Sequence, residues 1–500
     1  MINQNKVPLL SKSRFISGLQ CHLRLWHECY NRDFASEISP VQQAVFDTGH
    51  EVGRLATQLY PKGVLIEEDH LHHEDAVEST LKAMENPYAT AIFEAGFIHD
   101  GVRIRVDILE RLGKGTWNLI EVKSATSAKD IYLPDVAVQY HVLKGLGLNI
   151  DRVILMYLNN RYIYDGQNLE IEKLFSISDL THKAIIYQLQ IPTLLSDFND
   201  MLAKPEEPKI KPDRHCRVPY ECEFWEHCTR DMPAHWVMTL TGISQKKMDQ
   251  LDAQGIQDIK DIPASFPLSA LQDRIRDCVI NNSEYISSEL KDELEDMVYP
   301  IHFLDFETTF RAVPRYSGTK PYQSIPFQWS DHILFEDGSV AHEEYLCVED
   351  KDPRKDFTLS LLEILGSKGA IVTYSDYEER VIKGLTFEQL EFRDPLRALL
   401  GRFKDLCKII KKYYYHPAFH GAFSIKAVLP ALLPEMNYKN LEIQEGQLAG
   451  LAYLRMIDPD TPAEEKEKIR KDLRTYCGHD TLAMLKIREE LINRSQNVEK

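Results

Sequence analysis

The chain has 500 residues, of which 43% are hydrophobic and 27% charged, a composition typical of a soluble globular protein with two or three domains. Its net charge of −18 excludes a surface that is basic throughout, although a basic groove beside metal-binding acids stays compatible with it. The N-terminus lacks an apolar signal region and no run of about 18 apolar residues occurs, so we expect a cytoplasmic protein without membrane segments.

Residues 1–233 are expected to form an α/β domain. A helical stretch opens it, an amphipathic helix covers 45–59, and a β-hairpin covers 101–124. A further helix is expected over 136–146 and a buried strand over 152–158. This order of helix, sheet, helix and strand is typical of an α/β core.

The hairpin carries two acids that are expected to face each other. It turns at Gly113-Lys114-Gly115, and apolar residues alternate with polar ones along its first strand. If the hairpin is symmetric about Lys114, Asp107 and Glu121 lie opposite each other, with Cβ atoms about 4.5–5.5 Å apart. Two carboxylates at that distance need a proton or a cation between them, and Mg²⁺ or Mn²⁺ suits oxygen ligands.

Lys123 completes a candidate catalytic set in this hairpin. It is expected on the same face as Glu121, where it could orient an attacking water and stabilise a phosphorane-like transition state. Asp107 followed by Glu121-Val122-Lys123 resembles the core of the PD-(D/E)XK nucleases. The alternative is a cross-strand acid beside an ordinary surface Glu-x-Lys pair.

Three cysteines near the end of this domain form a candidate metal site. Cys216, Cys222 and Cys228 follow one another with five residues between each pair, and Cys21 is the natural fourth ligand. Thiolates at long and short separations suit an iron–sulfur cluster or Zn²⁺. The alternative is a group of buried, unreactive thiols. Disulfides are not expected from the nine cysteines of a cytoplasmic chain.

One cysteine before a nuclease core and three after it resembles the iron–sulfur RecB-like exonucleases, which include a CRISPR-associated nuclease and the AddB nuclease domain. The opening LSKSRFISGLQC is similar to theirs, and the resemblance covers roughly residues 8 to 230. It implies that Asp107, Glu121 and Lys123 are catalytic, that Gln139 supports them, and that the two acids bind the metal ion. It also implies a 4Fe-4S cluster that joins the two ends of the domain, bound by Cys21, Cys216, Cys222 and Cys228.

The chain departs from this family in its first helix. The family often has a metal-binding histidine four residues after a glycine, and counting from Gly49 gives Gly53 here. His50 and Glu51 lie close by, but Glu51 falls on the expected solvent-facing side of the helix. A third metal ligand is therefore unassigned.

Residues 234–298 are expected to form a helical connector. A helical run begins near Leu240 and ends near Gly255, and a second short helix is expected over 257–262. Two helices about a Gly-Ile turn resemble a helix-hairpin-helix, whose backbone amides can bind a phosphate. A plain helical spacer is the alternative, and the acid-rich stretch 289–296 is expected to be a solvated helix face.

The last domain, 299–500, opens with a strand that carries two acids. Asp305 and Glu307 share one face of the strand expected over 300–308, about 6.6 Å apart along it. That spacing lets them bind one or two metal ions jointly. An exposed edge strand could carry the same acids, but the flanking apolar residues favour burial, which is costly without a cation.

Three further residues complete a candidate site in this domain. Glu378 follows the strand expected over 371–374, although it could instead close a Ser-x-x-Glu capping box. Tyr476 and Asp480, four residues apart, would share one face of a helix. The alternative is that Gly478 breaks this helix and Asp480 caps the next one.

Asp305-x-Glu307, Glu378 and Tyr476-x-x-x-Asp480 resemble the DEDD exonucleases of the ribonuclease H-like fold, tyrosine subtype. The whole segment also looks like an uncharacterised domain that is often fused to RecB-like nucleases. The resemblance implies that four carboxylates hold two Mg²⁺ or Mn²⁺ ions and that Tyr476 orients the attacking water as a neutral phenol.

Glu378 departs from this family, which has an aspartate there. The longer side chain leaves activity at this site open. Asp405 is an alternative for the same role or a structural residue, and Ser424 and Lys426 are candidates for contact with a phosphate.

Together these patterns predict two metal-dependent nuclease sites that hydrolyse phosphodiester bonds of DNA, at ends or in single strands, the second as a 3′–5′ exonuclease. One alternative is a nucleic-acid-binding scaffold whose sites have lost their metal. Another is an RNA exonuclease, because the ribonuclease H-like fold serves both polymers. DNA repair, antiviral defence and mobile-element processing are all compatible with these patterns, which indicate no particular protein partner.

Overall fold

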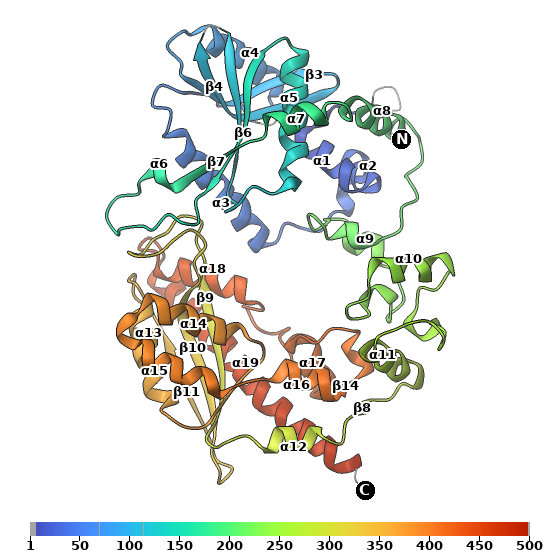
Figure 1. Ribbon diagram of the computed structural model, residues 1–500, viewed down its shortest axis with the longest axis vertical. Helices are drawn as coiled ribbons and strands as arrows, with labels where there is room; N and C mark the ends of the chain where they lie inside the picture. Colours follow the sequence, from blue (N-terminus) through green and yellow to red (C-terminus); the bar gives the residue numbers. More distant parts are fainter. Residues whose placement is uncertain (1–6, 70, 114, 499–500) are drawn as a thin grey trace. The chain divides into compact units, whose positions relative to one another are not determined.

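The computed structural model of the chain describes residues 7–69, 71–113 and 115–498. It has the expected mixed α/β architecture, with two large β-sheets and helices packed against them (Figure 1). None of the helices in the described part of the chain is long and apolar enough to span a membrane.

The chain divides into two compact units. The first consists of Met1–Asp231 and Arg311–Tyr322, and the second of Met232–Phe310 and Gln323–Lys500. Residues 234–298, expected as a connector, therefore lie within the second unit.

The first unit is built around one mixed sheet. Its strands lie in the order β2 (Val64–Leu65), β3 (Ala91–His99), β4 (Val102–Gly113), β5 (Thr116–Lys123), β6 (Asn149–Leu158) and β7 (Phe175–Asp179), and β1 (Leu10–Ser11) pairs with β4. β3, β4 and β5 are antiparallel neighbours, whereas β6 is parallel to β5. Parallel neighbours need a crossover, which α5 (Leu133–Gly145) supplies.

The remaining helices of this unit are α1 (Lys12–Gln20), α2 (His22–Tyr30), α3 (Pro40–Thr57), α4 (His73–Glu85), α6 (Ile171–Leu174), α7 (Thr181–Tyr187), α8 (Ile191–Leu202) and α9 (Trp225–Thr229). α3 begins at Pro40, earlier than expected, because Ser39 and Gln42 form a reciprocal capping box at its start.

Between Ile108 and Arg111 the β4–β5 hairpin has the register expected for a turn centred on Lys114, a residue that lies outside the described part of the chain. The register shifts between Arg111 and Gly113, and the paired residues begin at Ile108 and Ile120, next to Asp107 and Glu121. Ile108 pairs with Ile120 across the ladder. The buried side chains of β4 change from one side of the sheet to the other at Asp107. Val106 packs in the apolar cluster around α1 and α5, whereas Ile108 packs in the cluster around α3. Residues two apart in a regular strand would share one face. β4 is therefore irregular at Asp107.

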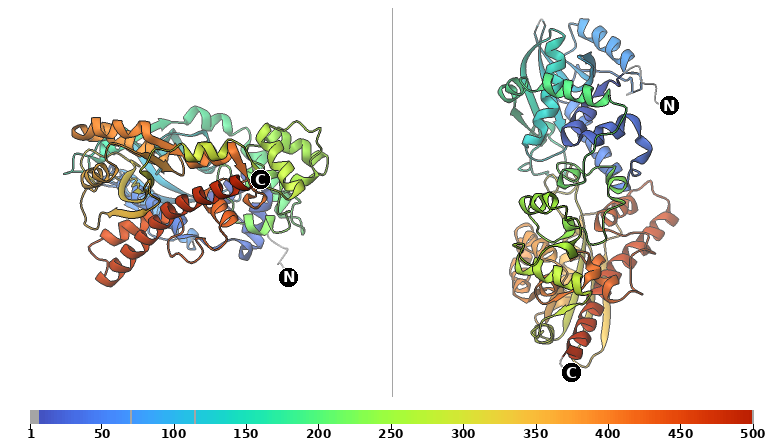
Figure 2. Two further views of the ribbon diagram at one scale, coloured as in Figure 1. Left: turned by 90° about the horizontal axis from the view of Figure 1, so that it is seen from below. Right: turned by 90° about the vertical axis from the view of Figure 1, so that its right-hand side faces the viewer.

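The second unit contains a five-stranded sheet in the order β11 (Val340–Leu346), β10 (Ile325–Leu334), β9 (Ile301–Thr309), β12 (Ala370–Thr373) and β13 (Phe403–Asp405). The first three strands are antiparallel neighbours, and β12 and β13 run parallel to β9. α13 (Arg354–Leu365), α14 (Tyr377–Glu388) and α15 (Arg393–Leu399) cover one face of this sheet, and α18 (Gly446–Ile457) and α19 (Ala463–Val498) cover the other (Figures 1 and 2).

Smaller elements complete the second unit. They are α10 (Gln245–Ala253), α11 (Ala270–Asn281), α12 (Leu290–Glu295), α16 (Leu406–Tyr413), α17 (Ile425–Leu432) and the two-stranded sheet of β8 (Tyr285–Ile286) with β14 (Tyr414–Tyr415). The helix expected over 257–262 is wrong: this stretch forms a single 3₁₀ turn, Ile259–Asp261. The side chain of Asp258 accepts a hydrogen bond from the Lys260 N–H, and Pro263 ends the turn.

Residues 311–322, which we call the strap, connect β9 to β10 but belong to the first unit. The strap bonds to the loop after β6: the Gly318 N–H donates to the Tyr164 carbonyl at 2.8 Å, and the Tyr164 N–H donates to the Thr319 carbonyl at 2.9 Å. Ala312 is 4% exposed and packs in the same apolar cluster as Val52 of α3. The strap is thus part of the core of the first unit.

Candidate functional site

The hairpin acids of the first unit lie together beside the β4–β5 ladder. Glu121 is 1% exposed, and one carboxylate oxygen of Asp107 accepts a hydrogen bond from the Val122 N–H at 2.7 Å. Burial, followed by the neighbouring charge of Glu121, raises the pKa of Asp107 to about 7. The burial of Glu121 excludes the alternative of an ordinary surface Glu-x-Lys pair.

Three polar side chains bind the Glu121 carboxylate. Lys123 donates to it at 2.7 Å and Gln139, from α5, at 2.7 Å. Lys12, at the start of α1, donates to its two oxygens at 2.9 and 3.0 Å. Burial disfavours the charged carboxylate, but the two ammonium groups outweigh burial and hold the pKa of Glu121 well below its usual range.

Lys12 and Asp135 are members of this site that the residue patterns did not single out. Asp135 forms an ion pair with Lys123 and lies 3.6 Å from the Lys12 ammonium. A signal for Asp135 was present, because it lies four residues before Gln139 on the same helix and therefore on the same helical face. Lys12 lies in the N-terminal motif, but only the pairing of β1 with β4 brings it to the hairpin.

Glu51, the other candidate on α3, does not bind the hairpin acids. It lies 3.6 Å from Arg311 of the strap, and Tyr322 of the strap lies next to Ser124. Glu51 therefore fits the expected surface charge better than a third metal ligand.

The four cysteines predicted to bind a metal group gather in the first unit. Cys21 lies between α1 and α2, next to Cys216 and Cys228, and Cys222 packs with Cys216 around the buried Phe224. Burial raises the pKa of Cys222 to about 12 and that of Cys228 to about 11, so these groups are thiols at neutral pH unless a cation binds them.

Hydrogen bonds join the two chain segments that carry these cysteines. The side chain of Gln20 donates to the carbonyls of His215 and Tyr220, each at 2.7 Å, and Arg24 pairs with Glu223 at 2.9 Å. The ends of the expected nuclease domain are thereby held together at the cysteine group.

The spacing of the cysteine sulfurs differs from that of a tetrahedral zinc site. Among the described residues, the one group of three metal-binding donors that lie within 4.8 Å of one another is Asp305, Glu307 and Cys477. Four thiolates around zinc, at about 2.3 Å from it, would lie about 3.8 Å apart. The cysteine group is therefore more open than a zinc site.

The four acids predicted in the second unit come together from three elements. Asp305 and Glu307 lie on β9, Glu378 on α14 and Asp480 on α19, and the last three are at most 8% exposed. Burial and mutual repulsion raise the pKa values of Asp305 and Glu307 well above their usual range, with Asp480 the strongest neighbour of each. Burial raises the pKa of Glu378 to about 8 and that of Asp480 to about 6.

α19 passes through Gly478 without a break, so the expected common face of Tyr476 and Asp480 is confirmed and the alternative of a helix break is wrong. Tyr476 is 5% exposed, and burial beside Asp480 raises its pKa, which keeps the phenol neutral. Tyr438 also hydrogen-bonds to Asp480, and no local pattern in the sequence indicates this contact.

The alternatives for Glu378 and Asp405 are also resolved by the geometry. α14 has Asp376 as its N-cap and no Ser375–Glu378 capping box is formed, and one of the buried oxygens of Glu378 has no hydrogen-bond partner among the described residues. Asp405 instead caps α16, since its side chain accepts a hydrogen bond from the Lys408 N–H at 2.8 Å. Asp405 therefore has the expected structural role, and its charge also contributes to the raised pKa of Glu378.

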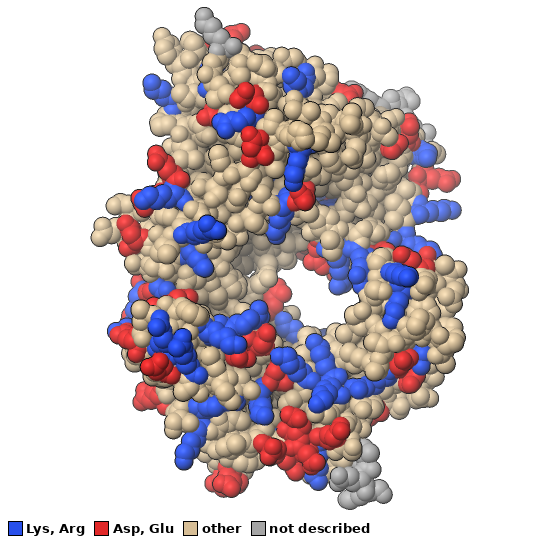
Figure 3. All heavy atoms as spheres, viewed as in Figure 1, with Lys and Arg blue, Asp and Glu red and all other residues tan. Residues whose placement is uncertain are grey.

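Basic residues flank the acidic group of the second unit. The exposed Lys426 lies near enough to Glu307 and Asp480 to lower their pKa values, and the exposed Lys408, Lys411 and Lys412 lie on α16. Figure 3 shows Lys and Arg side chains gathered over α16 and α17. Ser424 precedes α17 and makes no capping bond there.

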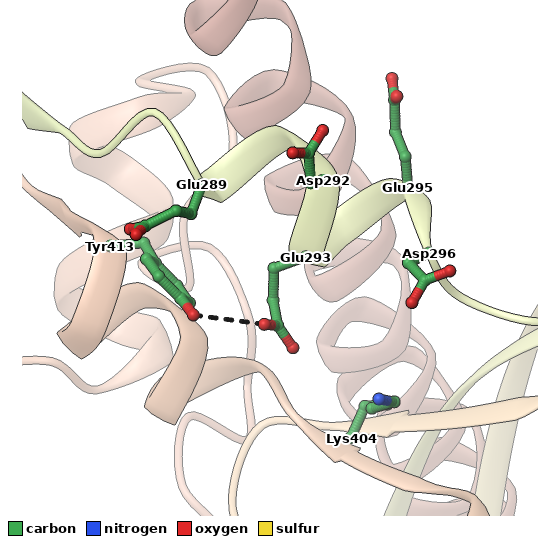
Figure 4. A pocket seen from close by; sticks show the side chains of 7 residues that line it. All are labelled: Glu289, Asp292, Glu293, Glu295, Asp296, Lys404 and Tyr413. Carbon is green, nitrogen blue, oxygen red and sulfur yellow. Dashed lines mark hydrogen bonds between the residues drawn. The ribbon is translucent and has the colours of Figure 1, made fainter.

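A separate pocket of about 620 Å³ lies beside α12 in the second unit (Figure 4). It is lined by acidic side chains together with one lysine and one tyrosine: Glu289, Asp292, Glu293, Glu295, Asp296, Lys404 and Tyr413. Leu290 and Leu294 face inward, so the expectation of a solvated acidic helix face is confirmed. None of the predicted site residues lines this pocket.

A family model described as a domain of unknown function, DUF2779, matches residues 302–424. The matched stretch includes Asp305, Glu307 and Glu378 and ends before Tyr476 and Asp480. No curated protein and no solved structure matches the chain.

Proposed function

We propose that the protein is a metal-dependent nuclease that hydrolyses phosphodiester bonds of DNA, with its principal site in the second unit. One observation carries this proposal: Asp305, Glu307, Glu378 and Asp480 converge with raised pKa values in a buried space. Carboxylates that are buried so close together need protons or divalent cations between them, and Mg²⁺ and Mn²⁺ prefer such oxygen ligands.

The strand order of the second unit supports a ribonuclease H-like assignment. Strands β11, β10, β9, β12 and β13 give the order 3-2-1-4-5, and both the first strand and the helix after the fourth carry acids. In a two-ion site the metals activate a water and stabilise the departing oxygen. The neutral Tyr476 phenol would orient that water, and Lys426 would attract the phosphate backbone.

The first unit is proposed to be a PD-(D/E)XK nuclease domain of the RecB-like type. Its order of three antiparallel strands, a crossover helix and a parallel strand fits that family, as does the set of Asp107, Glu121, Lys123 and Gln139. Asp107 and Glu121 would hold the divalent ion there, and Lys123 would stabilise negative charge on the phosphate. The open cysteine group favours a 4Fe-4S cluster over Zn²⁺.

A non-catalytic, nucleic-acid-binding role is a second candidate for the first unit alone. The observation that favours it is the pair of ammonium groups on Glu121, which supplies the positive charge that a metal ion would otherwise provide.

The nine unpaired cysteines fit a reducing compartment, and we propose the cytoplasm as the location.

The test is a degradation assay with end-labelled single-stranded DNA and RNA in Mg²⁺ or Mn²⁺. Asp305→Asn is expected to lower the rate of degradation by the second unit at least about 100-fold. Asp107→Asn is expected to lower the rate of degradation by the first unit to the same extent. Asp376→Asn and Asp130→Asn, which change exposed acids of the same units, are matched controls. Full degradation by the Asp305→Asn and Asp107→Asn double variant would overturn the proposal.

A further inference from the structure

Cys477 lies inside the acidic group of the second unit. It is fully buried, and its thiol donates to a carboxylate oxygen of Asp305 at a distance of 3.5 Å from sulfur to oxygen. Its sulfur and one oxygen each of Asp305 and Glu307 all lie within 4.8 Å of one another. The sulfur therefore occupies the same space as the donors that would hold a divalent ion.

These distances fit a single ion with mixed ligands. Two ligands on opposite sides of an ion are separated by at most twice the bond length, about 4–5 Å for bonds of 2.0–2.4 Å. Three donors within 4.8 Å of one another can therefore contact one ion with small side-chain movements.

A second observation also indicates a missing ligand in this space. Glu378 is 4% exposed, interacts electrostatically with Asp305 and Glu307, and has a buried oxygen without a hydrogen-bond partner among the described residues. A buried carboxylate oxygen that lacks a donor is costly, and an ion bound among these residues would satisfy it.

We propose that Cys477 is a metal ligand and makes this site prefer zinc, cobalt or iron(II) over magnesium. On binding, the sulfur loses its proton to solvent and forms a bond to the metal. Thiolate ligands favour the softer divalent ions, whereas Mg²⁺ prefers oxygen. The inference concerns the site of the proposed function and rests on it only for the presence of a divalent ion.

The sequence position of Cys477 is consistent with this role. Residues three apart on a helix lie on one face, and Cys477 is three residues before Asp480. Tyr438 and Tyr476 face the same carboxylate of Asp480, and Lys426 is the nearby cation. The sulfur is therefore the softest donor in a group that is otherwise composed of oxygens.

The experiment is a Co²⁺ titration of the full chain without nucleic acid, followed by absorbance in the near ultraviolet, where thiolate-to-cobalt charge transfer occurs. Variants Cys477→Ser and Cys477→Ala are compared with the unchanged protein and with Asp305→Asn. Cys278→Ser is the matched control, because Cys278 is a buried thiol of the same unit outside the acidic group. Circular dichroism verifies that each variant is folded.

The charge-transfer band is expected to be weaker in both Cys477 variants and in Asp305→Asn than in the unchanged protein and in Cys278→Ser. The band that remains in the Cys477 variants belongs to the cysteines of the first unit. The Zn²⁺ dissociation constant should rise at least about tenfold in Cys477→Ser while that for Mg²⁺ changes little. The proposal is overturned if the band of Cys477→Ser is as strong as that of the unchanged protein, because the whole band would then come from the cysteines of the first unit. Loss of Zn²⁺ affinity in Cys477→Ala but not in Cys477→Ser would also overturn it, since the thiol would then be only a hydrogen-bond donor.

The outcome is separable from that of the degradation assay. A chain that binds Co²⁺ through Cys477 but degrades no nucleic acid would retain this inference and refute the proposed function. A chain that degrades DNA with an unchanged cobalt spectrum in Cys477→Ser would do the reverse.

Discussion

Lys12 donates hydrogen bonds to both oxygens of the Glu121 carboxylate, across more than a hundred residues of sequence. The contact exists because β1 pairs with β4 in parallel and α1 starts immediately after β1, with Ser11 as its cap. The ammonium group neutralises a carboxylate that burial would otherwise keep protonated. The N-terminal motif therefore has an electrostatic role at the hairpin.

Removal of this ammonium group should destabilise the first unit. Lys12→Met keeps the aliphatic part of the side chain but leaves Glu121 with only Lys123 and Gln139 as donors. We expect a loss of about 2 kcal/mol in the free energy of unfolding, the usual size for hydrogen bonds to a buried charge. Urea denaturation measures it, with the exposed Lys144→Met as control. An unchanged midpoint in both variants would contradict the role of Lys12.

The acidic group of the second unit should make stability depend on pH. The pKa of Glu378 is raised from 4.5 in the unfolded chain to about 8 in the folded protein. Between these values the folded protein holds a proton that the unfolded chain has released, so the free energy of unfolding falls as pH rises. The slope is up to about 1.4 kcal/mol per pH unit for this group, in the absence of divalent ions.

Glu378→Gln should remove this part of the pH dependence. The amide cannot ionise, so the variant should be more stable than the unchanged protein at pH 8 and similar to it at pH 4.5. Denaturation at a series of pH values with a chelator present gives both slopes. Glu379→Gln is the control, since Glu379 pairs with Lys383 on the outer side of the same helix. If the free energy of unfolding changes with pH in the same way in Glu378→Gln and in the unchanged protein, Glu378 does not have the raised pKa of a buried carboxyl without a cation beside it.

The strap should be needed for the stability of the first unit. Ala312→Asp introduces a carboxylate into the apolar cluster with Val52, where no cation is available to pair with it among the described core residues. Burial of an unpaired polar group costs about 2–4 kcal/mol. Limited proteolysis should therefore cleave the first unit faster in this variant, while Ala128→Asp, on an exposed loop of the same unit, should behave like the unchanged chain.

The local parts of the fold and site were accessible from the sequence. A turn flanked by alternating apolar residues indicates the register of β4 and β5, so the spacing predicts that Asp107 and Glu121 come close together. The register shift beside the turn and the irregularity of β4 at Asp107 do not follow from it. The face shared by Tyr476 and Asp480 follows in the same way from helical periodicity.

Contacts between distant segments could not be predicted by such arguments. Periodicity within a segment does not indicate which other segment packs against it, so Lys12 at the hairpin and the strap in the first unit had no local signal. Cys477 was missed for a different reason. A buried thiol on a helix is usually an ordinary core residue, and only the convergence of β9 with α19 surrounds this one with carboxylates.

Substitution of Tyr476 tests whether the acidic group of the second unit is catalytic or only structural. Tyr476→Phe removes only the hydroxyl, which lies beside Asp480, while Tyr438 keeps its own hydrogen bond to that carboxylate. If the hydroxyl orients the attacking water, degradation by the second unit should fall by about 10- to 100-fold with Mn²⁺ affinity unchanged. Tyr438→Phe should instead weaken metal binding, because it frees the Asp480 carboxylate to move. Rates from single-turnover assays and dissociation constants from Mn²⁺ titrations distinguish the two variants, and equal effects on both quantities would refute a distinct role for Tyr476.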